Sequence, residues 1–289
     1  MVLEVRNVTK SFGKKTVLKD VSVQIAENEI VAFVGANGSG KTTLMKCILG
    51  FLPFEGDIRV MGEPVSFGET KSNEHIGYLP DVPQFYNFYN AKQYLKLCQK
   101  VSGNVSNERI DEMLTLVGLA GRKEKIHQYS RGMKQRLGIA QALLHKPKLL
   151  ICDEPTSALD PEGRAQILSI LQAAKEETAI LFSTHILSEA EHISDRMMIL
   201  HDQKIRFDGP ITRQAFTGHY YVEVNRPLDV QLLQAFQLEK SKQGYILQVV
   251  DEAEKDLFLK QLMASDYSLQ KFTLESQSLE QFVQEVMTK

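Results

Sequence analysis

The 289-residue sequence contains no tryptophan and only three cysteines, Cys47, Cys98 and Cys152. These cysteines stand far apart in the chain, so they offer neither the ligand spacing of a metal-binding cluster nor a plausible disulfide framework. A reducing compartment is the setting that fits such a sequence best.

Long apolar runs are also missing, and a membrane-spanning helix needs about 20 consecutive apolar residues. The most apolar stretches are all short: Ile30–Ala36, Leu149–Cys152 and Met197–Leu200. The first residues, MVLEVRNVTKSF, do not have the pattern of a signal peptide. We therefore expect that the chain does not cross a membrane alone and that any membrane role requires a partner.

Charge of one sign is not in excess either, since the formal net charge is −2. Without a broad basic field, nucleic acid is not an expected partner. Apolar residues make up 43% of the sequence and charged residues 24%, as in ordinary globular proteins. The length suits one large domain and a small one.

Apolar, strand-like segments alternate with helical ones over most of the chain. The expected strands are Glu29–Val34, Leu149–Asp153, Ala179–Ser183 and Arg196–Leu200, with a return strand at Lys204–Asp208. Expected helices begin near Lys41 and cover Pro161–Lys175, where proline stands in the first turn behind Asp160. This alternation predicts an α/β fold with a largely parallel sheet that is covered on both faces.

Two further regions differ from this pattern. Helical spacing around residues 84–145 predicts a helical subdomain inserted into a core domain of residues 1–217. Strand-like segments at Tyr220–Val224 and Tyr245–Val250 and amphipathic helices at Asp251–Ala264 and Ser278–Met287 follow it. Residues 218–289 are therefore expected to form a small α+β accessory domain.

A phosphate-binding loop follows the first of these strands. The segment consists of Gly35, Ala36, Asn37, Gly38, Ser39, Gly40, Lys41 and Thr42, with Thr43 next. It matches the P-loop pattern GxxxxGK[ST], in which backbone N–H groups and a helix N-terminus surround phosphate oxygens. Lys41 would then contact the β- and γ-phosphates, and the Thr42 hydroxyl would bind Mg²⁺.

Two acids end the strand at Leu149–Asp153. Asp153 is suited to hold Mg²⁺, and Glu154 to polarise an attacking water as a general base. Two solvated acids at a strand end are the simpler interpretation of this pair alone. Because ligands of parallel sheets bind at the carboxyl ends of strands, the phosphate loop favours the catalytic interpretation.

Three more segments make the sequence resemble the ABC ATPase family. Tyr129–Met133 is similar to its LSGGQ signature, Ser157–Asp160 to its D-loop and Ser183–His185 to its H-loop. They follow in the family's order, and the resemblance covers about residues 1–208. It implies a RecA-like P-loop NTPase core with an antiparallel β part and an inserted helical subdomain.

The resemblance also implies that two ATPase domains work head to tail with ATP between them. Ser130 and the Gly132 amide of one subunit would contact the γ-phosphate held by the other. Asp160 would communicate across the dimer, and His185 would contact the γ-phosphate and position Glu154. Ser130 and Asp160 are equally well placed to be helix caps, and His185 alone could be an ordinary strand-end residue.

Several positions of this chain differ from the family pattern or allow a second interpretation. Phe12 resembles the family aromatic that stacks on adenine, although simple packing explains it as well. Where the family has a glutamine, this chain has Asp81, with Gln84 nearby; either residue is a candidate to reach Mg²⁺ or water. Arg131 and Met133 replace the usual glycine and glutamine of the signature.

The resulting hypothesis is an ATP- and Mg²⁺-dependent subunit that powers a separate integral membrane permease, as a homodimer or a heterodimer with a related ATPase. It would lie peripherally at the cytoplasmic side of the cell membrane. The segment Ser278–Val283 resembles tails of exporter-type ATPases, which favours export. The alternative is a soluble ABC ATPase acting on ribosomes or DNA. A GTPase is disfavoured because no Asn-Lys-x-Asp segment is present.

Overall fold

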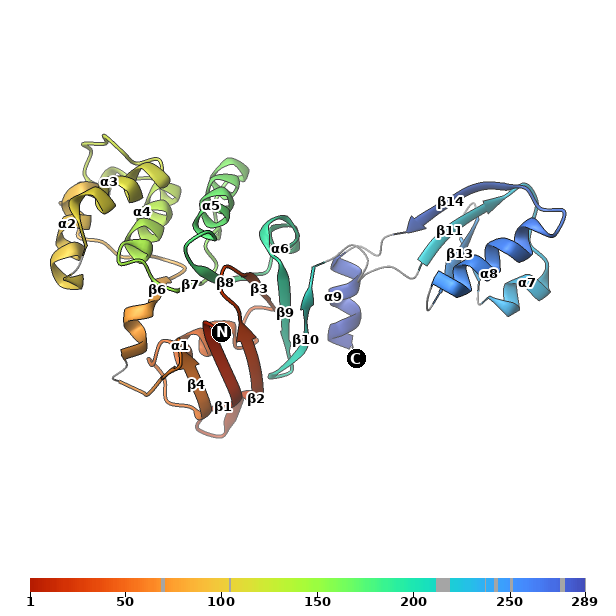
Figure 1. The fold of residues 1–289 in the computed structure, drawn as a ribbon, viewed down its shortest axis with the longest axis horizontal. Helices are drawn as coiled ribbons and strands as arrows, with labels where there is room; N and C mark the ends of the chain where they lie inside the picture. Colours follow the sequence, from red (N-terminus) through yellow and green to blue (C-terminus); the bar gives the residue numbers. More distant parts are fainter. Residues whose placement is uncertain are drawn as a thin grey trace. The chain divides into compact units, whose positions relative to one another are not determined.

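The computed structural model describes residues 1–68, 71–103, 105–211, 219–236, 238–241, 244–249, 252–275 and 279–288. The chain divides into two compact units, Met1–Pro210 and Ile211–Lys289 (Figure 1). The boundary expected between residues 217 and 218 lies outside the described residues.

A six-stranded sheet organises the first unit, with the strand order β10-β9-β3-β8-β7-β6. The strands are β3 (Ile30–Val34), β6 (Ile76–Leu79), β7 (Leu149–Cys152), β8 (Ala179–Thr184), β9 (Arg196–His201) and β10 (Lys204–Pro210). All neighbours are parallel except β10, which returns antiparallel to β9. Strands β3, β7 and β8 are buried at every position, as in a sheet that is covered on both faces. The predicted α/β class is confirmed.

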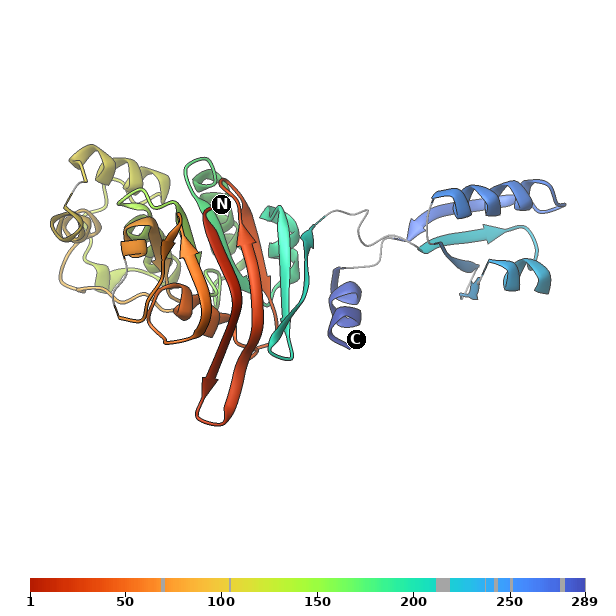
Figure 2. The same cartoon turned by 60° about the horizontal axis from the view of Figure 1, so that its bottom comes forward.

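A second, antiparallel sheet lies in the same unit. It has the order β2-β1-β4-β5, from β1 (Leu3–Phe12), β2 (Lys15–Ile25), β4 (Glu55–Val60) and β5 (Glu63–Pro64). Figure 2 shows β1 and β2 as a long hairpin, coloured red. Helix α1 (Lys41–Ile48) belongs to one hydrophobic core with both sheets, in which Leu44 and Ile48 join Val5 and Ile58. This packing holds the helix that follows the phosphate loop.

The helices of the first unit come next. They are α2 (Ala91–Ser102), α3 (Asn107–Leu116), α4 (Arg131–Leu143), α5 (Pro161–Ala174) and α6 (Leu187–Ile193), with short 3₁₀ turns at Lys71–His75 and Ile126–Gln128. Helices α2, α3 and α4 contact one another, α4 also contacts β6, and α6 contacts β3 and β8 (Figure 1). As predicted, Asp160 caps α5, and its carboxylate accepts from the Gly163 N–H at 2.9 Å.

The second unit contains a four-stranded antiparallel sheet with the order β12-β13-β11-β14. Its elements are β11 (His219–Val224), α7 (Val230–Ala235), β12 (Glu239–Lys240), β13 (Tyr245–Gln248), α8 (Glu252–Met263), β14 (Leu269–Glu275) and α9 (Leu279–Thr288). Val222, Leu247 and Phe258 are central to its own apolar core. The sequence pattern did not predict β14 or α7.

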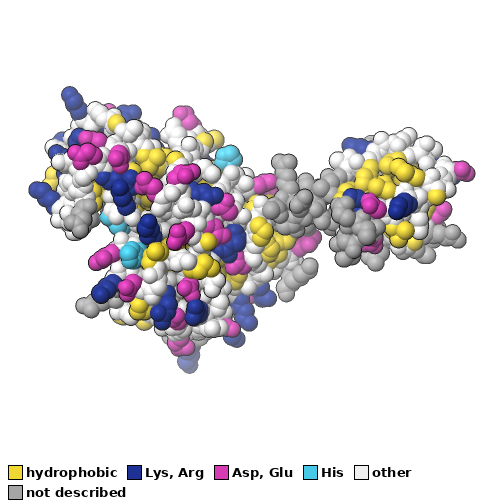
Figure 3. Space-filling model, viewed as in Figure 1, with side chains coloured by type: hydrophobic (Ala, Val, Ile, Leu, Met, Phe, Trp, Pro, Cys, Tyr) yellow, Lys and Arg dark blue, Asp and Glu magenta, His cyan; other side chains and the backbone are white. Residues whose placement is uncertain are grey.

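The described surface carries both signs of charge. Figure 3 shows basic and acidic side chains interspersed over the face in view. Within the part of the chain that the structure describes, no helix is long and apolar enough to cross a membrane.

Candidate active site

A cavity of about 320 Å³ opens at the carboxyl ends of the parallel strands. Its lining joins the phosphate loop to the acidic strand end and consists of Asn37, Gly38, Gly40, Lys41, Thr42, Thr43, Asp81, Glu154, Ser157 and His185. Most of the residues predicted from four separate segments thus meet at one place. We call this space the phosphate cavity.

The phosphate loop follows β3. It begins with Gly35 and ends with Gly40, and glycine is required at the two positions for different reasons. A Cβ on Gly35 would lie 2.7 Å from the Leu200 carbonyl oxygen and 2.7 Å from the Ser39 hydroxyl, so no side chain fits there. Gly40 has a φ of 115°, which side chains rarely adopt, and it caps α1. The buried Ser39 hydroxyl has no hydrogen-bond partner. An orphaned hydroxyl in a tight loop at a helix N-terminus fits the binding of an anion.

Lys41 brings an ammonium group to the cavity, and its side chain is only 6% exposed. Its Nζ donates to the Gly35 carbonyl at 2.7 Å and lies 3.8 Å from Glu154 Oε1. Burial lowers the pKa of this ammonium group, while the charges of Glu154 and Asp153 act in the opposite direction. A poorly solvated cation held in this way is ready to bind phosphate oxygens.

Thr42 and Asp153 come from α1 and the end of β7, and they meet at the floor of the site. The Thr42 hydroxyl is 2.8 Å from Asp153 Oδ2 and 3.0 Å from Oδ1. The Ser183 hydroxyl, from β8, donates to Asp153 Oδ1 at 2.8 Å. A hydroxyl and a carboxylate side by side are the hard oxygen donors that Mg²⁺ prefers, so these residues fit that ion.

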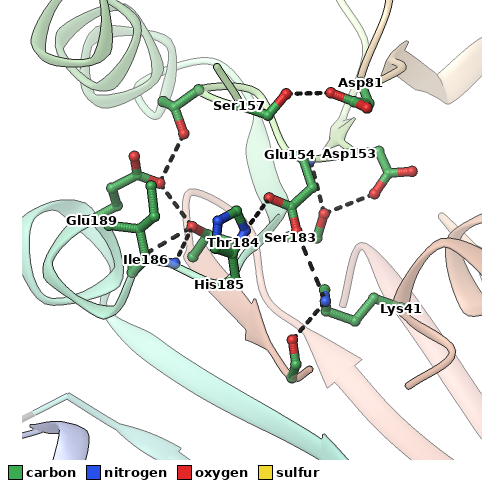
Figure 4. A network of polar contacts seen from close by, with 12 residues as sticks. Lys41, Asp81, Asp153, Glu154, Ser157, Ser183, Thr184, His185, Ile186 and Glu189 are labelled. Atoms are coloured by element: carbon green, nitrogen blue, oxygen red, sulfur yellow. Dashed lines mark hydrogen bonds and ion pairs between the residues drawn. The ribbon is translucent and has the colours of Figure 1, made fainter. Parts of the chain in front are cut away.

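Glu154 and His185 lie at one edge of the cavity and contact each other. His185 Nδ1 lies 2.7 Å from Glu154 Oε2. Figure 4 shows the two side chains pointing toward each other. The Glu154 N–H donates to the Ser183 hydroxyl at 2.9 Å, and its φ of 50° lies in the left-handed region. Strained backbone of this kind persists only where the surroundings hold it, and it concentrates at functional sites. The arrangement aims one carboxylate oxygen at Lys41 and the other at His185.

Asp81 lies at the rim of the same cavity. Its carboxylate accepts hydrogen bonds from the Ser157 hydroxyl and, at 3.4 Å, from Arg131. Gln84, the other candidate for this position, is exposed and does not line the cavity. Of the two residues, Asp81 is therefore the one that the fold brings to the phosphate loop.

A second cavity of about 310 Å³, here called the signature cavity, lies beside the start of α4. Ser130, Gly132 and Asp160 line it, so the structure groups these three residues apart from the phosphate loop. Ser130 caps α4, and its hydroxyl accepts from the Met133 N–H at 3.2 Å. Phe12 stands at the end of β1, 49% exposed, with the Lys10 ammonium 4.8 Å from its ring centre; it lines neither cavity.

Two residues that organise the site, Ser183 and Glu189, had no individual role predicted from the sequence. Ser183 links Asp153 to the Glu154 backbone, as described above. Glu189, on α6, is only 3% exposed and accepts hydrogen bonds from the Thr156 and Thr184 hydroxyls at 2.9 and 2.8 Å. These bonds tie the segment after Glu154 to the segment before His185 (Figure 4). The signal available in the sequence was an acid on the apolar side of the short helix after His185.

Comparison with known proteins agrees with this geometry. Residues 18–157 match the family model described as ABC transporter. The chain is 40% identical over 236 residues to the uncharacterized ABC transporter ATP-binding protein YxlF of Bacillus subtilis, covering 79% of this chain and 78% of that protein. It is 36% identical to the bacitracin transport ATP-binding protein BcrA of Bacillus licheniformis, over 77% of this chain and 74% of BcrA.

A solved structure described as the ATP-binding subunit of an ABC transporter also matches. It superposes with a TM-score of 0.67 and 27% identity, covering 91% of this chain and all of that one. Fold and site define a P-loop nucleotide hydrolase. Within that class, the chain belongs to the family of ABC transporter ATP-binding proteins. It binds and hydrolyses ATP and energises a membrane permease.

Proposed function

We propose that the phosphate cavity is the ATP hydrolysis site and that Glu154 is its general base. Lys41 binds the β- and γ-phosphates, Thr42 and Asp153 hold Mg²⁺, and His185 keeps Glu154 oriented. Mg²⁺ supplies neutralisation of the charge that develops on the phosphate oxygens. The observation that carries the proposal is the Glu154 carboxylate, held 2.7 Å from His185 Nδ1 and 3.8 Å from Lys41 Nζ beside the phosphate loop.

The test replaces Glu154 with Gln in the purified chain. The substitution keeps size and hydrogen bonding but removes the base, so ATP still binds and turnover falls by about 10²- to 10⁴-fold. Glu176→Gln, at an exposed acid after α5, is the matched control and leaves turnover unchanged. Unchanged turnover in Glu154→Gln would remove Glu154 from the role of base.

We also propose that two ATPase domains close around ATP head to tail. The signature cavity, with Ser130, Gly132 and Asp160, faces the γ-phosphate held by the partner domain. The first residues of α4, after the Ser130 cap, line this cavity. The partial positive charge of the helix N-terminus favours an anion there. Trapping by ATP in Glu154→Gln tests this, because the trapped protein elutes as a dimer. Ser130→Ala, which keeps ATP binding, is expected to lower the dimer fraction.

We propose that this chain contacts the permease at the cytoplasmic side of the membrane. The contact surface would be an aromatic groove beside the Asp81 segment. This groove, about 380 Å³, is lined by Tyr78, Tyr86 and Tyr94 from β6, the following loop and α2. Tyr86 and Phe88 are 58% and 64% exposed and their ring centres lie 6.1 Å apart, so they form one exposed aromatic patch of the kind that marks an interaction surface. Asp81 lies between Tyr78 and Tyr86 in the chain and lines the phosphate cavity, so contact at the groove would reach the ATP site through this segment.

Copurification from gently solubilised native membranes tests this partner. A stoichiometric multi-span protein is expected with the tagged chain and is lost in Tyr86→Ala. Phe67→Ala, at another exposed phenylalanine, is the control that retains it. Recovery of ribosomal or DNA-bound partners instead would favour the soluble alternative. Export is the proposed direction, supported by the tail resemblance at Ser278–Val283 and by the likeness to the bacitracin transport protein.

A further inference from the structure

Two residues that depart from the family pattern contact each other in this chain. Arg131, the first residue of α4, donates to Asp81 Oδ1 at 3.4 Å and to the Ser157 hydroxyl at 3.0 Å. Ser157 in turn donates to Asp81, a bond visible in Figure 4. The three residues lie after β6, after β7 and at the start of α4, so only the fold brings them together.

This cluster lies between the two cavities. Asp81 and Ser157 line the phosphate cavity, whereas Arg131 lines the signature cavity. The backbone of Asp81 is held as well, because the Gln135 side chain of α4 donates to its carbonyl oxygen at 3.0 Å. The carboxylate of Asp81 is therefore held at the rim of the site by a chain of contacts that ends on α4.

The negative charge of Asp81 matters for ATP binding, because ATP is itself an anion. The site already contains Asp153 and Glu154, and Asp81 brings a third carboxylate to a cavity that receives phosphates. Like charges in one cavity repel one another and the phosphates, and an opposite charge next to the Asp81 carboxylate offsets that repulsion. The Arg131 guanidinium is the cation that the structure places on Asp81.

We propose that Arg131 is a positioning residue for ATP binding: together with Ser157 it holds and neutralises the Asp81 carboxylate, so that the phosphate cavity accepts ATP. The inference rests on the proposed role of that cavity. Arg131 acts through Asp81 and not by contact with the nucleotide of its own subunit. Its effect on ATP affinity therefore exists only while Asp81 is charged.

A double-mutant cycle on the purified full chain tests this dependence, with ATP as the titrant and the dissociation constant as the readout. Arg131→Ala exposes the repulsion and is expected to weaken ATP binding by about two- to fivefold, the range for partly exposed ion pairs. Asp81→Asn removes the repulsion, and its own ATP affinity is the reference for the second half of the cycle. Adding Arg131→Ala to Asp81→Asn then causes no further loss. Arg131→Lys, which keeps the charge, restores most of the affinity.

Two controls separate this proposal from other causes. Lys134→Ala removes a positive charge from the same helix and is expected to leave ATP affinity unchanged. The coupling between Arg131 and Asp81 should shrink at high salt, whereas a merely structural effect would not. A loss in Arg131→Ala that persists in the Asp81→Asn background, or no loss at all, overturns the proposal. If Lys41→Ala binds ATP as tightly as the native chain, the phosphate site itself is wrong.

Discussion

His185 Nδ1 lies 2.7 Å from Glu154 Oε2, although the two residues leave different strands of the sheet. His185 follows β8 and Glu154 follows β7, and these strands are parallel neighbours. Their carboxyl ends therefore open at the same edge, where the imidazole fixes one oxygen of the carboxylate. A base that is held in one orientation loses little freedom when it reacts.

His185→Ala is expected to lower turnover by about 100-fold while ATP affinity changes little, because the imidazole orients the base. Steady-state hydrolysis and equilibrium ATP binding, measured on the same sample, separate the two effects. His192→Ala, at an exposed histidine of α6, should match the native chain. A parallel loss of binding in His185→Ala would point to a phosphate contact as its main role.

Nothing that contacts Gly132 in the described residues requires a glycine at this position. Gly132 lies in the first turn of α4, and an added Cβ would meet only Leu159 Cδ2 at 3.8 Å, an ordinary contact. Gly132→Ala should therefore stabilise the chain, by up to about 1 kcal/mol, since alanine favours helix over glycine. Close approach of a partner's nucleotide would instead be hindered, and hydrolysis should fall.

Urea unfolding and turnover, compared on the same variant, test this opposition. Higher stability with lower turnover is the expected result for Gly132→Ala. Higher stability with native turnover would mean that no ligand or partner approaches this helix end.

ATP binding should depend on pH through Lys41. Only the ammonium form binds phosphate, and burial lowers its pKa, so affinity should fall at a lower pH than for an ordinary lysine. Lys41→Arg stays charged throughout the range and is the control whose affinity, whatever its level, should not decline there. Titrations of ATP binding between neutral and alkaline pH measure both curves.

The lowered pKa of Lys41 has the opposite consequence for the stability of the nucleotide-free protein, which should increase with pH. Between the lowered pKa of Lys41 and the ordinary value, the unfolded chain binds one more proton than the folded chain. The contribution of Lys41 to the free energy of unfolding therefore increases as pH rises through this window. Across these pH values, the free energy of unfolding of the native protein should rise relative to that of the Lys41→Arg protein. Equal slopes would show that the burial of Lys41 does not penalise its charge.

Glu189 is expected to matter for stability and for the site. In Glu189→Ala the buried Thr156 and Thr184 hydroxyls lose their acceptor, which should cost about 1–3 kcal/mol of unfolding free energy. Turnover of the folded fraction should fall too, because these threonines flank Glu154 and His185 along the chain. Glu191→Ala, at an exposed position of the same helix, is the control. Native turnover with reduced stability would restrict Glu189 to a structural role.

Local chemistry explains what could be predicted without a structure. The phosphate loop, the acidic strand end and the proline-led helix at Pro161 are contiguous patterns, and each needs only its own residues to be recognised. Buried β-branched runs and helical spacing likewise predicted β3, β7, β8 and the α/β class. By contrast β14 and α7, whose stability depends on the core of the second unit, gave no strong local signal.

Contacts between distant segments were decided by the order of the strands. Because β8 lies between β3 and β7, Ser183 and His185 enter the space between the phosphate loop and Glu154. Thr42 reaches Asp153 across 111 residues of chain because β3 and β7 are parallel and end at the same edge of the sheet. The sequence by itself determined which chemical groups this ATPase carries. Only the tertiary structure decided that Asp81 pairs with Arg131 and Glu189 with two threonines, because such pairs depend on which ends meet at one edge of the sheet.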